Sequence, residues 1–398
     1  MSKKLAPLEG QRGIAAIIVV VHHFILGFHP SLSGILPNTR TDYSIVGSPL
    51  FTVINGTGAV FYFFTLSGFV LSWGYFNSPN SRKLVWDALR RWPRLAGPTT
   101  IICVLSASLF QTGAYYYREA GELSGSSWLK TFGGSSFYDT IPSFSTAIWQ
   151  GLTTFVSGHY AMNTNLWTMV YEYYGSLIVF VLCPLFLKLK SRGLLVVAAL
   201  LCAGSLAVST FPQSLDKLGF KFVVPFIVGM TIAKLLSTSK AKFSLPTSAG
   251  MVALGLYFLG YYEPINYYSW AAPITHVLSP KTVSIVIFSI GSGSIILATM
   301  GNTRLFLSMD NAFMRHLGRI SFPIYLVHLL VLGSVSSWLY IEIFRSGGLA
   351  LFATTLTFCI AFSLPLAAFD EWWVKKVRLF FERAKQFSPA FLSAGPRR

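Results

Sequence analysis

The sequence has little charge, and acidic residues are especially scarce in it. Only 11% of its 398 residues are charged, with 14 acidic against 31 basic side chains, whereas a soluble domain carries roughly 25% charged residues. Hydrophobic residues make up 53% of the chain, and its mean hydropathy is +0.58. This composition excludes an ordinary soluble domain. The net charge of +17 would also suit a nucleic-acid-binding protein, but the apolar composition favours a membrane protein with basic loops, and we expect no nucleic-acid partner.

Cysteine is almost absent, and the few cysteines form no recognisable motif. The four residues, Cys103, Cys183, Cys202 and Cys359, all lie in apolar runs. They have neither metal-ligand spacing nor the pattern of a disulfide framework, so we expect small core residues and no metal site. The sequence also lacks internal repeats, low-complexity tracts and a nucleotide-binding loop. It therefore predicts one membrane-embedded domain over residues 1–398.

Long apolar segments dominate what is present. Each is near the roughly 20 residues that a helix needs to cross a bilayer. The sequence therefore predicts an all-α, polytopic integral membrane protein with about ten transmembrane helices. We place them at residues 13–29, 53–76, 95–112, 165–187, 193–211, 218–236, 246–262, 282–300, 321–343 and 348–369.

The distribution of basic residues predicts the orientation of these helices. With the N-terminus in the cytoplasm, about three quarters of the 31 lysines and arginines fall in cytoplasmic segments, as the positive-inside rule requires. Both termini are then cytoplasmic, and residues 370–398 form a basic cytoplasmic tail. The loop at 77–94 lies inside. The long loop at about 112–164 lies outside, where it has room to cover a cavity mouth.

Arg12 and His23 stand on one apolar segment, eleven residues apart. A helix turns about 100° per residue, so the two side chains lie within about 20° of each other and about 16 Å apart along the axis. Ionisable groups inside a membrane usually face a protein interior or a polar cavity. His23 is therefore a candidate general base, although a histidine that only bonds to a neighbouring helix has the same pattern. His22 points about 100° away, and we expect a structural role for it.

Glu172 is the only carboxylate well inside any predicted span. A carboxylate at that depth needs a partner. We expect that partner to be His23, because a carboxylate can orient an imidazole and stabilise its protonated form. The alternatives are an unrelated polar link between helices and a protonated glutamate.

Two further groups allow more than one interpretation. The basic segment that contains Arg90, Arg91 and Arg94 could bind a phosphorylated ligand, but its residues alone favour ordinary topology charge in contact with anionic lipid. Tyr325 and His328 are three residues apart and share a helix face. They either line a cavity or bond between helices.

Taken together, five segments resemble the acyltransferase 3 family of integral-membrane O-acyltransferases. The blocks occur in family order over nearly the whole chain, and the block with Trp167 resembles fungal members that modify small secondary metabolites. The segments are Leu8 through Phe24, Phe63 through Phe69, Arg91-Trp92-Pro93-Arg94, Leu166-Trp167-Thr168 with Glu172, and Ile320 through His328.

The resemblance implies a reaction and assigns roles to residues. Members transfer an acyl group, often acetyl, from cytoplasmic acyl-CoA, a co-substrate rather than a permanently bound cofactor, to a hydroxyl. His23 becomes the catalytic base, with Arg12 and Glu172 beside it. Other candidates are Arg90, Arg91 and Arg94 for the CoA phosphates, and Trp167, Tyr325 and His328 for the acceptor. Two departures from the family pattern are Glu9, where Asp is common, and Leu95-Ala96-Gly97-Pro98 after the two arginines.

The acceptor is the most open part of this hypothesis. A small-molecule hydroxyl, such as one on a secondary metabolite, is the first candidate, and a cell-surface glycan is the second. A polytopic transporter is the alternative from a different class, since ten spans suit it equally. Transporters often show inverted repeats and interrupted helix pairs, and we find neither in the sequence.

Overall fold

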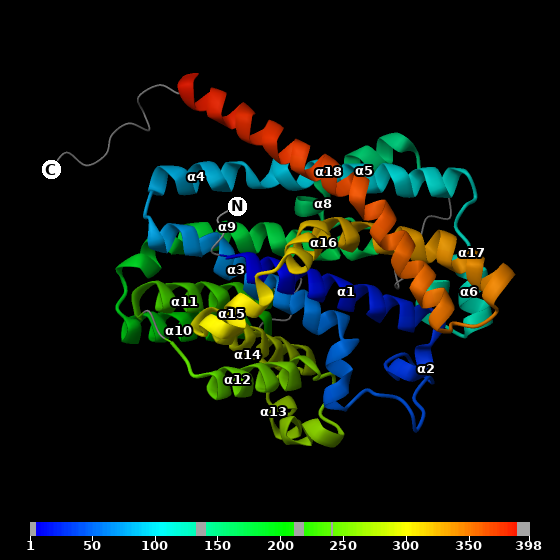
Figure 1. Cartoon of the computed structure of the whole chain (residues 1–398), viewed down its shortest axis with the longest axis horizontal. Coiled ribbons are helices and arrows are strands. Elements are labelled where there is room, and N and C mark those ends of the chain that lie inside the picture. The colour runs from blue at the N-terminus through cyan, green and yellow to red at the C-terminus, as the bar shows by residue number, and fades with distance from the viewer. Residues whose placement is uncertain (1–4, 133–140, 211–218, 240–241, 388–398) are drawn as a thin grey trace.

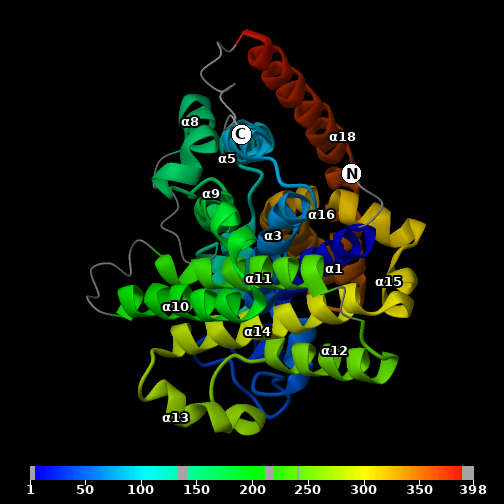
Figure 2. The ribbon, with the colours of Figure 1, turned by 90° about the vertical axis from the view of Figure 1, so that its left-hand side faces the viewer.

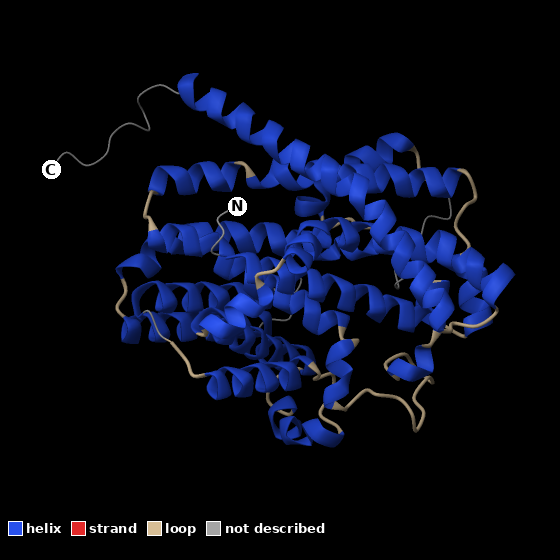
Figure 3. Cartoon of the chain, viewed as in Figure 1, coloured by secondary structure: helices blue, strands red, loops and turns tan. Residues whose placement is uncertain are grey.

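The computed structural model describes residues 5–132, 141–210, 219–239 and 242–387. Over these residues the protein contains only helices, turns and loops, with no strand (Figure 3). The prediction of an all-α polytopic membrane protein is confirmed. In the described residues, nine helices or helix runs are long and apolar enough to cross a membrane. They occupy Ala6–Phe28, Gly56–Asn77, Ser81–Gln111, Thr164–Lys188, Ser191–Val208, Phe220–Ser239, Pro280–Gly301, Ala312–Phe344 and Leu349–Ala384.

All ten predicted apolar segments form helices, but one of them is short. Helix α12, Leu245–Leu259, has 15 residues, which is about 22 Å at 1.5 Å per residue, whereas the hydrocarbon core measures about 30 Å. It lies alongside α14 (Pro280–Gly301) in both views (Figure 1 and Figure 2). The start of α1 and the end of α18 both lie toward the left of Figure 1, on the same side of the bundle.

Three central helices hold most of the site residues: α1 (Ala6–Phe28), α3 (Gly56–Asn77) and α16 (Ala312–Val331). Two further groups pack on either side of them. One contains α10 (Ser191–Thr210), α11 (Val224–Ser239), α12 and α14, and the other contains α5 (Arg91–Gln111), α8 (Phe144–Ser157) and α9 (Trp167–Lys188). Figure 2 views α3, α5 and α16 roughly along their axes, whereas α10, α11, α12 and α14 run across that view.

Shorter helices connect these elements and cover their ends. They are α2 (Pro30–Ser33), α6 (Tyr117–Ser124), α7 (Ser127–Lys130), α13 (Ala272–Thr275) and α15 (Thr303–Met309). Helix α16 continues through two π-helical segments and α17 (Ser337–Leu339) to Phe344. Residues Pro49–Val53, Thr164–Leu166, Phe220–Val223 and Asn266–Ala271 form 3₁₀ turns.

Helices α1 and α16 run in parallel and approach closely through glycines. A Cβ at Gly13 would lie 2.4 Å from Leu317 Cγ, and one at Gly318 would lie 2.5 Å from the Glu9 carbonyl oxygen. Small residues allow such contact between membrane helices. The seam between these two helices therefore fixes which residues of α16 meet Arg12 and His23.

The basic segment at 77–94 is not a loop, so that part of the prediction is wrong. Asn80 caps a helix, α4 (Ser81–Leu89), by accepting a hydrogen bond from the Lys83 N–H, as Asn commonly does at helix starts. After a break at Arg90, α5 starts at Arg91. The apolar signal missed α4 because half of its residues are polar or charged.

Because α4 turns back along the bundle, the arginines that follow it lie deep. Arg91 Nε donates a hydrogen bond to Ser176 Oγ at 3.0 Å, and Ser176 lies twelve residues before the end of α9 at Lys188. That is about 18 Å along the helix. The two-arginine segment is therefore not at the rim of the bundle.

The last helix, α18, is a single element of 39 residues, Leu349–Phe387. It packs on α16 and α5 and passes the two-arginine segment, where Trp373 Nε1 donates a hydrogen bond to the Pro93 carbonyl at 2.7 Å. It continues well past residue 369, where the last predicted span ends. Its second half therefore brings further residues to the site.

Candidate functional site

The two helices of the central seam join His23 and His328. His23 Nδ1 and His328 Nε2 are 3.0 Å apart, and their rings stack with centroids 5.0 Å apart. His328 is fully buried, whereas His23 is half-buried. The sequence placed Arg12 and His23 on one face of α1. The structure confirms this, because both side chains bond to residues of α16.

Backbone carbonyls fix the tautomers of this histidine pair. His328 Nδ1 lies 2.8 Å from the Tyr325 carbonyl oxygen and 3.3 Å from that of Ile324. A carbonyl only accepts, so the neutral His328 ring carries its proton on Nδ1, and its Nε2 accepts from His23 Nδ1. The neutral His23 ring then has no proton on Nε2. That nitrogen has a free lone pair, which is what a general base requires.

The segment after α5 covers the histidine pair at the far end of α1. Trp128 of α7 stacks on His23, with ring centroids 5.0 Å apart. Ser124 Oγ donates a hydrogen bond to the Gly27 carbonyl at 2.7 Å, and Ser126 Oγ donates one to that of Leu26. The loop at 112–164 was predicted to cover a cavity mouth. Its α6–α7 part covers His23, whereas α8 packs on α5 and α9. Residues 133–140 lie outside the described residues.

His22 makes a separate contact. Its Nδ1 lies 2.7 Å from the Ile54 carbonyl oxygen, and the ring packs directly on Gly56, where a Cβ would lie 2.5 Å from it. The side chain is buried. Its structural role stays a prediction, and these contacts are those of a link between α1 and the start of α3.

Arg12 faces α16 about two helical turns before the histidine pair, because its partner there is Ser321 and that of His23 is His328. Arg12 Nε donates a hydrogen bond to Ser321 Oγ at 2.9 Å, and its Nη2 forms an ion pair with Glu9 Oε2 at 3.0 Å. It therefore contacts neither His23 nor Glu172 directly. It forms one wall of a cavity.

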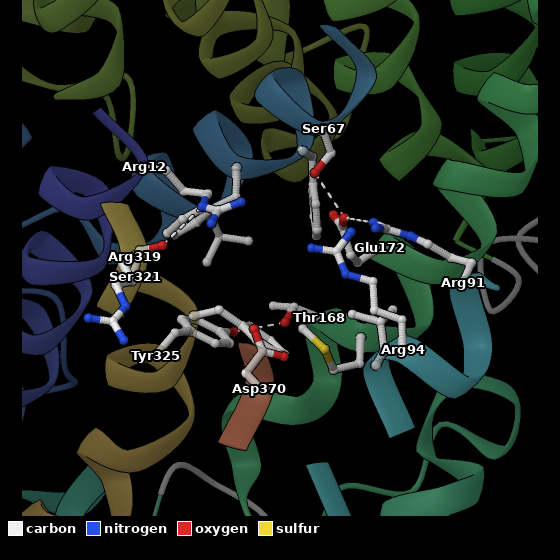
Figure 4. Close-up of a pocket in the computed structure, with 16 residues that line it drawn as sticks. Arg12, Ser67, Arg91, Arg94, Thr168, Glu172, Arg319, Ser321, Tyr325 and Asp370 are labelled. Atoms are coloured by element: carbon white, nitrogen blue, oxygen red, sulfur yellow. Dashed lines mark hydrogen bonds and ion pairs between the residues drawn. The ribbon is translucent and has the colours of Figure 1, made fainter. Parts of the chain in front are cut away.

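This cavity, which we call the inner cavity, has a volume of about 130 Å³. Its lining combines four arginines with two carboxylates and an apolar wall that includes Phe63, Phe64 and Met169. Figure 4 shows Arg12 and Arg91 on opposite sides of it. The charged residues are Arg12, Arg91, Arg94, Arg319, Glu172 and Asp370.

Glu172 does not pair with His23, so the predicted partner is wrong. Its Oε1 accepts a hydrogen bond from Ser67 Oγ at 2.8 Å and forms an ion pair with Arg91 (Figure 4). The side chains of Arg91 and Glu172 are only 8% and 14% exposed. A buried carboxylate needs a cation or donors, and α4 brings Arg91 deep enough to supply that cation. His23 instead lies nearer the C-terminal end of α1 and bonds to His328 of α16.

Two charged side chains of the inner cavity form no ion pair among the described residues. Arg94 is solvent-accessible and extends from α5 toward the cavity, and Asp370 of α18 enters it from another side (Figure 4). The other three arginines of the inner cavity form ion pairs: Arg12 with Glu9, Arg91 with Glu172, and Arg319 with Glu371. Arg90, which is not part of this lining, pairs with Asp87. Arg94 and Asp370 are therefore the ions most available to a ligand.

The three residues considered for the acceptor lie in different places. Tyr325 lines the inner cavity, and its hydroxyl hydrogen-bonds to Thr168 Oγ1 and the Asn165 carbonyl, both at 2.8 Å. His328 is outside the lining and holds His23 instead. Trp167 is also outside it, packed against Tyr171 and Phe222 with centroids 5.9 and 6.1 Å away.

A second, larger cavity adjoins the inner one. This outer cavity has a volume of about 430 Å³ and lies between α3, α4, α5 and α18. Arg91 and Arg94 line both cavities. The two spaces therefore share the wall that the two-arginine segment forms.

Sequence reasoning missed Asp370 and the contribution of Ser67. The last apolar segment was drawn to residue 369, so Asp370 was assigned to the tail, although it lies within a continuous helix. A useful signal was the run Trp372-Trp373 directly after the acidic pair. Paired tryptophans continue an apolar helix face beyond its first charge, and this pattern indicates that the helix does not end there.

Comparison with known proteins gives one match. The model of the acyltransferase domain of the acyltransferase 3 family matches residues 6–366, which is most of the chain and runs from α1 into the first half of α18. Neither the curated proteins nor the solved structures give a match.

Proposed function

The chain belongs to the acyltransferase 3 family and is a membrane-bound acyltransferase, and from that premise we propose its reaction. We propose that it transfers an acetyl group from acetyl-CoA to a hydroxyl of a small molecule, with His23 as the base. The match itself implies an acyl donor and an acceptor. The identities of the two substrates and the roles of the residues are our proposal.

One observation carries the proposal, namely the histidine pair. Two carbonyls orient His328, and His328 orients His23 so that its Nε2 has no proton. This is the logic of a catalytic triad, in which a buried acceptor holds a histidine in the tautomer that the reaction needs. His328 acts through His23, so we assign it as a positioning residue rather than an acceptor-binding one.

The proposed chemistry is one acyl transfer. His23 Nε2 removes the proton of the acceptor hydroxyl as the oxygen attacks the thioester carbonyl carbon. The new C–O ester bond forms and the C–S bond breaks. The CoA sulfur leaves with the electron pair and receives the proton from His23, which returns the imidazole to its neutral form.

The donor reaches this histidine from the inner cavity. Tyr325 lines the cavity and lies against His328, with ring centroids 5.9 Å apart, so its ring connects the cavity wall to the histidine pair. The thioester would pass this ring on its way to His23. Arg94 has no ion pair among the described residues, and we assign it to the CoA phosphates.

We also propose that the side of the bundle where α1 starts and α18 ends faces the cytoplasm. The basic residues favour this orientation, and CoA would then enter from its own compartment. Position 82 lies at the exposed start of α4. In a variant without the native cysteines, Arg82→Cys should escape an impermeant thiol reagent added to intact cells. Labelling from outside would reverse the orientation.

The experiment that tests the function compares metabolites from cells with and without the protein by mass spectrometry. We expect an acetyl-sized mass increase on a hydroxylated small molecule, and release of free CoA when purified protein receives that molecule and acetyl-CoA. An acetyl group found only on cell-surface glycan would identify the other acceptor class. Import or export of an unmodified compound without CoA release would contradict the proposal and favour a transporter.

A further inference from the structure

The outer cavity has a composition that the reaction chemistry alone does not require. Five basic side chains line it, with Asp87 as its single acidic residue: Lys83, Arg90, Arg91, Arg94 and Arg378. Asp87 is shared, because Lys83 Nζ lies 3.0 Å from Asp87 Oδ2 and Arg90 pairs with Asp87 Oδ1. The cavity therefore has a surplus of cations, which suits a ligand with several negative charges.

The two cavities differ in size, as the two ends of an acyl-CoA do. The acyl-pantetheine end is slender, and the nucleotide end is bulky. The inner cavity, about 130 Å³, admits only a slender group, whereas the outer cavity, about 430 Å³, falls in the range of roughly 300–1,000 Å³ that ligand pockets occupy. An apolar wall that includes Val70, Leu71 and Phe180 faces the basic side chains. A flat heterocycle next to several phosphates matches this combination of one apolar wall and one basic wall.

From these features, and resting on the acyl-CoA donor proposed above, we infer that the outer cavity binds the 3′-phosphorylated nucleotide of CoA. Arg91 and Arg94 line both spaces, so the diphosphate that joins the nucleotide to the pantetheine arm lies at that shared wall. The arm then enters the inner cavity. The 3′-phosphate lies at the other end of the outer cavity, against Lys83 of α4 and Arg378 of α18.

The contribution of α18 comes from beyond the region that the family model matches. That match ends at residue 366, and Arg378 lies a little over two turns past Asp370 on the same helix. Trp86 of α4 and Phe381 of α18 hold the two helices together there, with ring centroids 6.0 Å apart. Among the described residues, the ion pair of Arg378 is a long contact to Glu382, at 3.6 Å. Arg378 can therefore turn to a phosphate without losing a close ion pair.

The test measures binding to purified protein by calorimetry, with CoA and with dephospho-CoA, which lacks only the 3′-phosphate. Wild type should bind CoA more tightly than dephospho-CoA. The double variant Lys83→Gln/Arg378→Gln should lose about threefold to tenfold of its affinity for CoA and almost none for dephospho-CoA, as expected for partly exposed phosphate contacts. Arg383→Gln is the matched control, because it removes an arginine of the same helix that is exposed and outside the cavity lining.

The outcomes separate this inference from the function on which it rests. If wild type binds neither compound, the proposed donor is wrong, and the nucleotide site with it. If wild type binds CoA but the double variant behaves as Arg383→Gln does, the donor stands and the nucleotide site is wrong. An equal loss for both compounds would also overturn the inference, because it would indicate a disturbed fold or a general charge effect. Gel filtration of each variant confirms that it is folded.

Discussion

The two ends of the site differ in how completely the protein satisfies its own polar groups. At the histidine pair, both nitrogens of His328 and Nδ1 of His23 have protein partners. In the inner cavity, Arg94 and Asp370 have no ion pair among the described residues. The first end is organised before any ligand arrives. The second end has charges that a ligand can complete, and such a division between a fixed catalytic group and an open binding wall is what group transfer needs.

The largest effect should be on turnover, and it should come from removing the base of the histidine pair. His23→Ala should lower turnover by about 10²–10⁴, because that is what a positioned base typically contributes. CoA binding should be almost unchanged, since the donor contacts lie in the two cavities. The measurement is CoA release with the acceptor that the metabolite comparison identifies, alongside calorimetry with CoA.

Two neighbouring histidines serve as controls for this prediction. His22→Ala removes a histidine that bonds to the Ile54 carbonyl, and it should retain most activity. His328→Gln should fall between the two, because it loosens the orientation of His23 without removing the base. Normal turnover in His23→Ala, or loss confined to His22→Ala, would show that the wrong histidine was chosen.

The next effect should appear in stability, at the nearly buried ion pair that Arg91 and Glu172 form in the inner cavity. Glu172→Gln leaves Arg91 without its counter-charge, and breaking a buried pair costs about 3–5 kcal/mol. The midpoint of thermal unfolding, followed by the fluorescence of the ten tryptophans, should therefore fall by several degrees. The double variant Arg91→Met/Glu172→Leu should recover much of this loss because it removes both charges together. If the double variant is less stable than Glu172→Gln, the loss of stability in Glu172→Gln does not come from the unpaired charge of Arg91.

The smallest effects should come from Arg94 and Asp370, the two charged side chains without an ion pair among the described residues. Removing these charges should change the affinity for CoA in opposite directions. Arg94→Ala should weaken CoA binding about tenfold, and Arg94→Lys should restore it only in part, because lysine lacks the planar fork. Asp370→Asn should strengthen CoA binding about twofold to threefold, since it removes a negative charge that faces an anionic ligand. Calorimetry measures both. Weaker binding in Asp370→Asn would mean that Asp370 contacts the donor directly.

The sequence predicted which residues are buried better than it predicted their partners. The 3.6-residue repeat placed Arg12 and His23 on one face, and both do face α16. The burial of Glu172 implied a partner, but the partner predicted from the sequence was His23, whereas the structure shows Arg91. The partner depends on how deep α4 carries the arginines, and α4 has no apolar signal. Asp370 was missed for a related reason, since hydropathy ends a span at the first charge whereas the backbone of α18 continues.

The length of α18 has a mechanical consequence. A helix of 39 residues measures about 58 Å at 1.5 Å per residue, nearly twice the thickness of a hydrocarbon core. It therefore extends from among the membrane helices to well outside them, with Pro365 as an interior proline at which such a helix can bend. Asp370 and Trp373 sit part-way along it, at the wall of the inner cavity and at the two-arginine segment. A fluorophore attached near Ala384 would report, from outside the bilayer, any tilt that accompanies filling of the site.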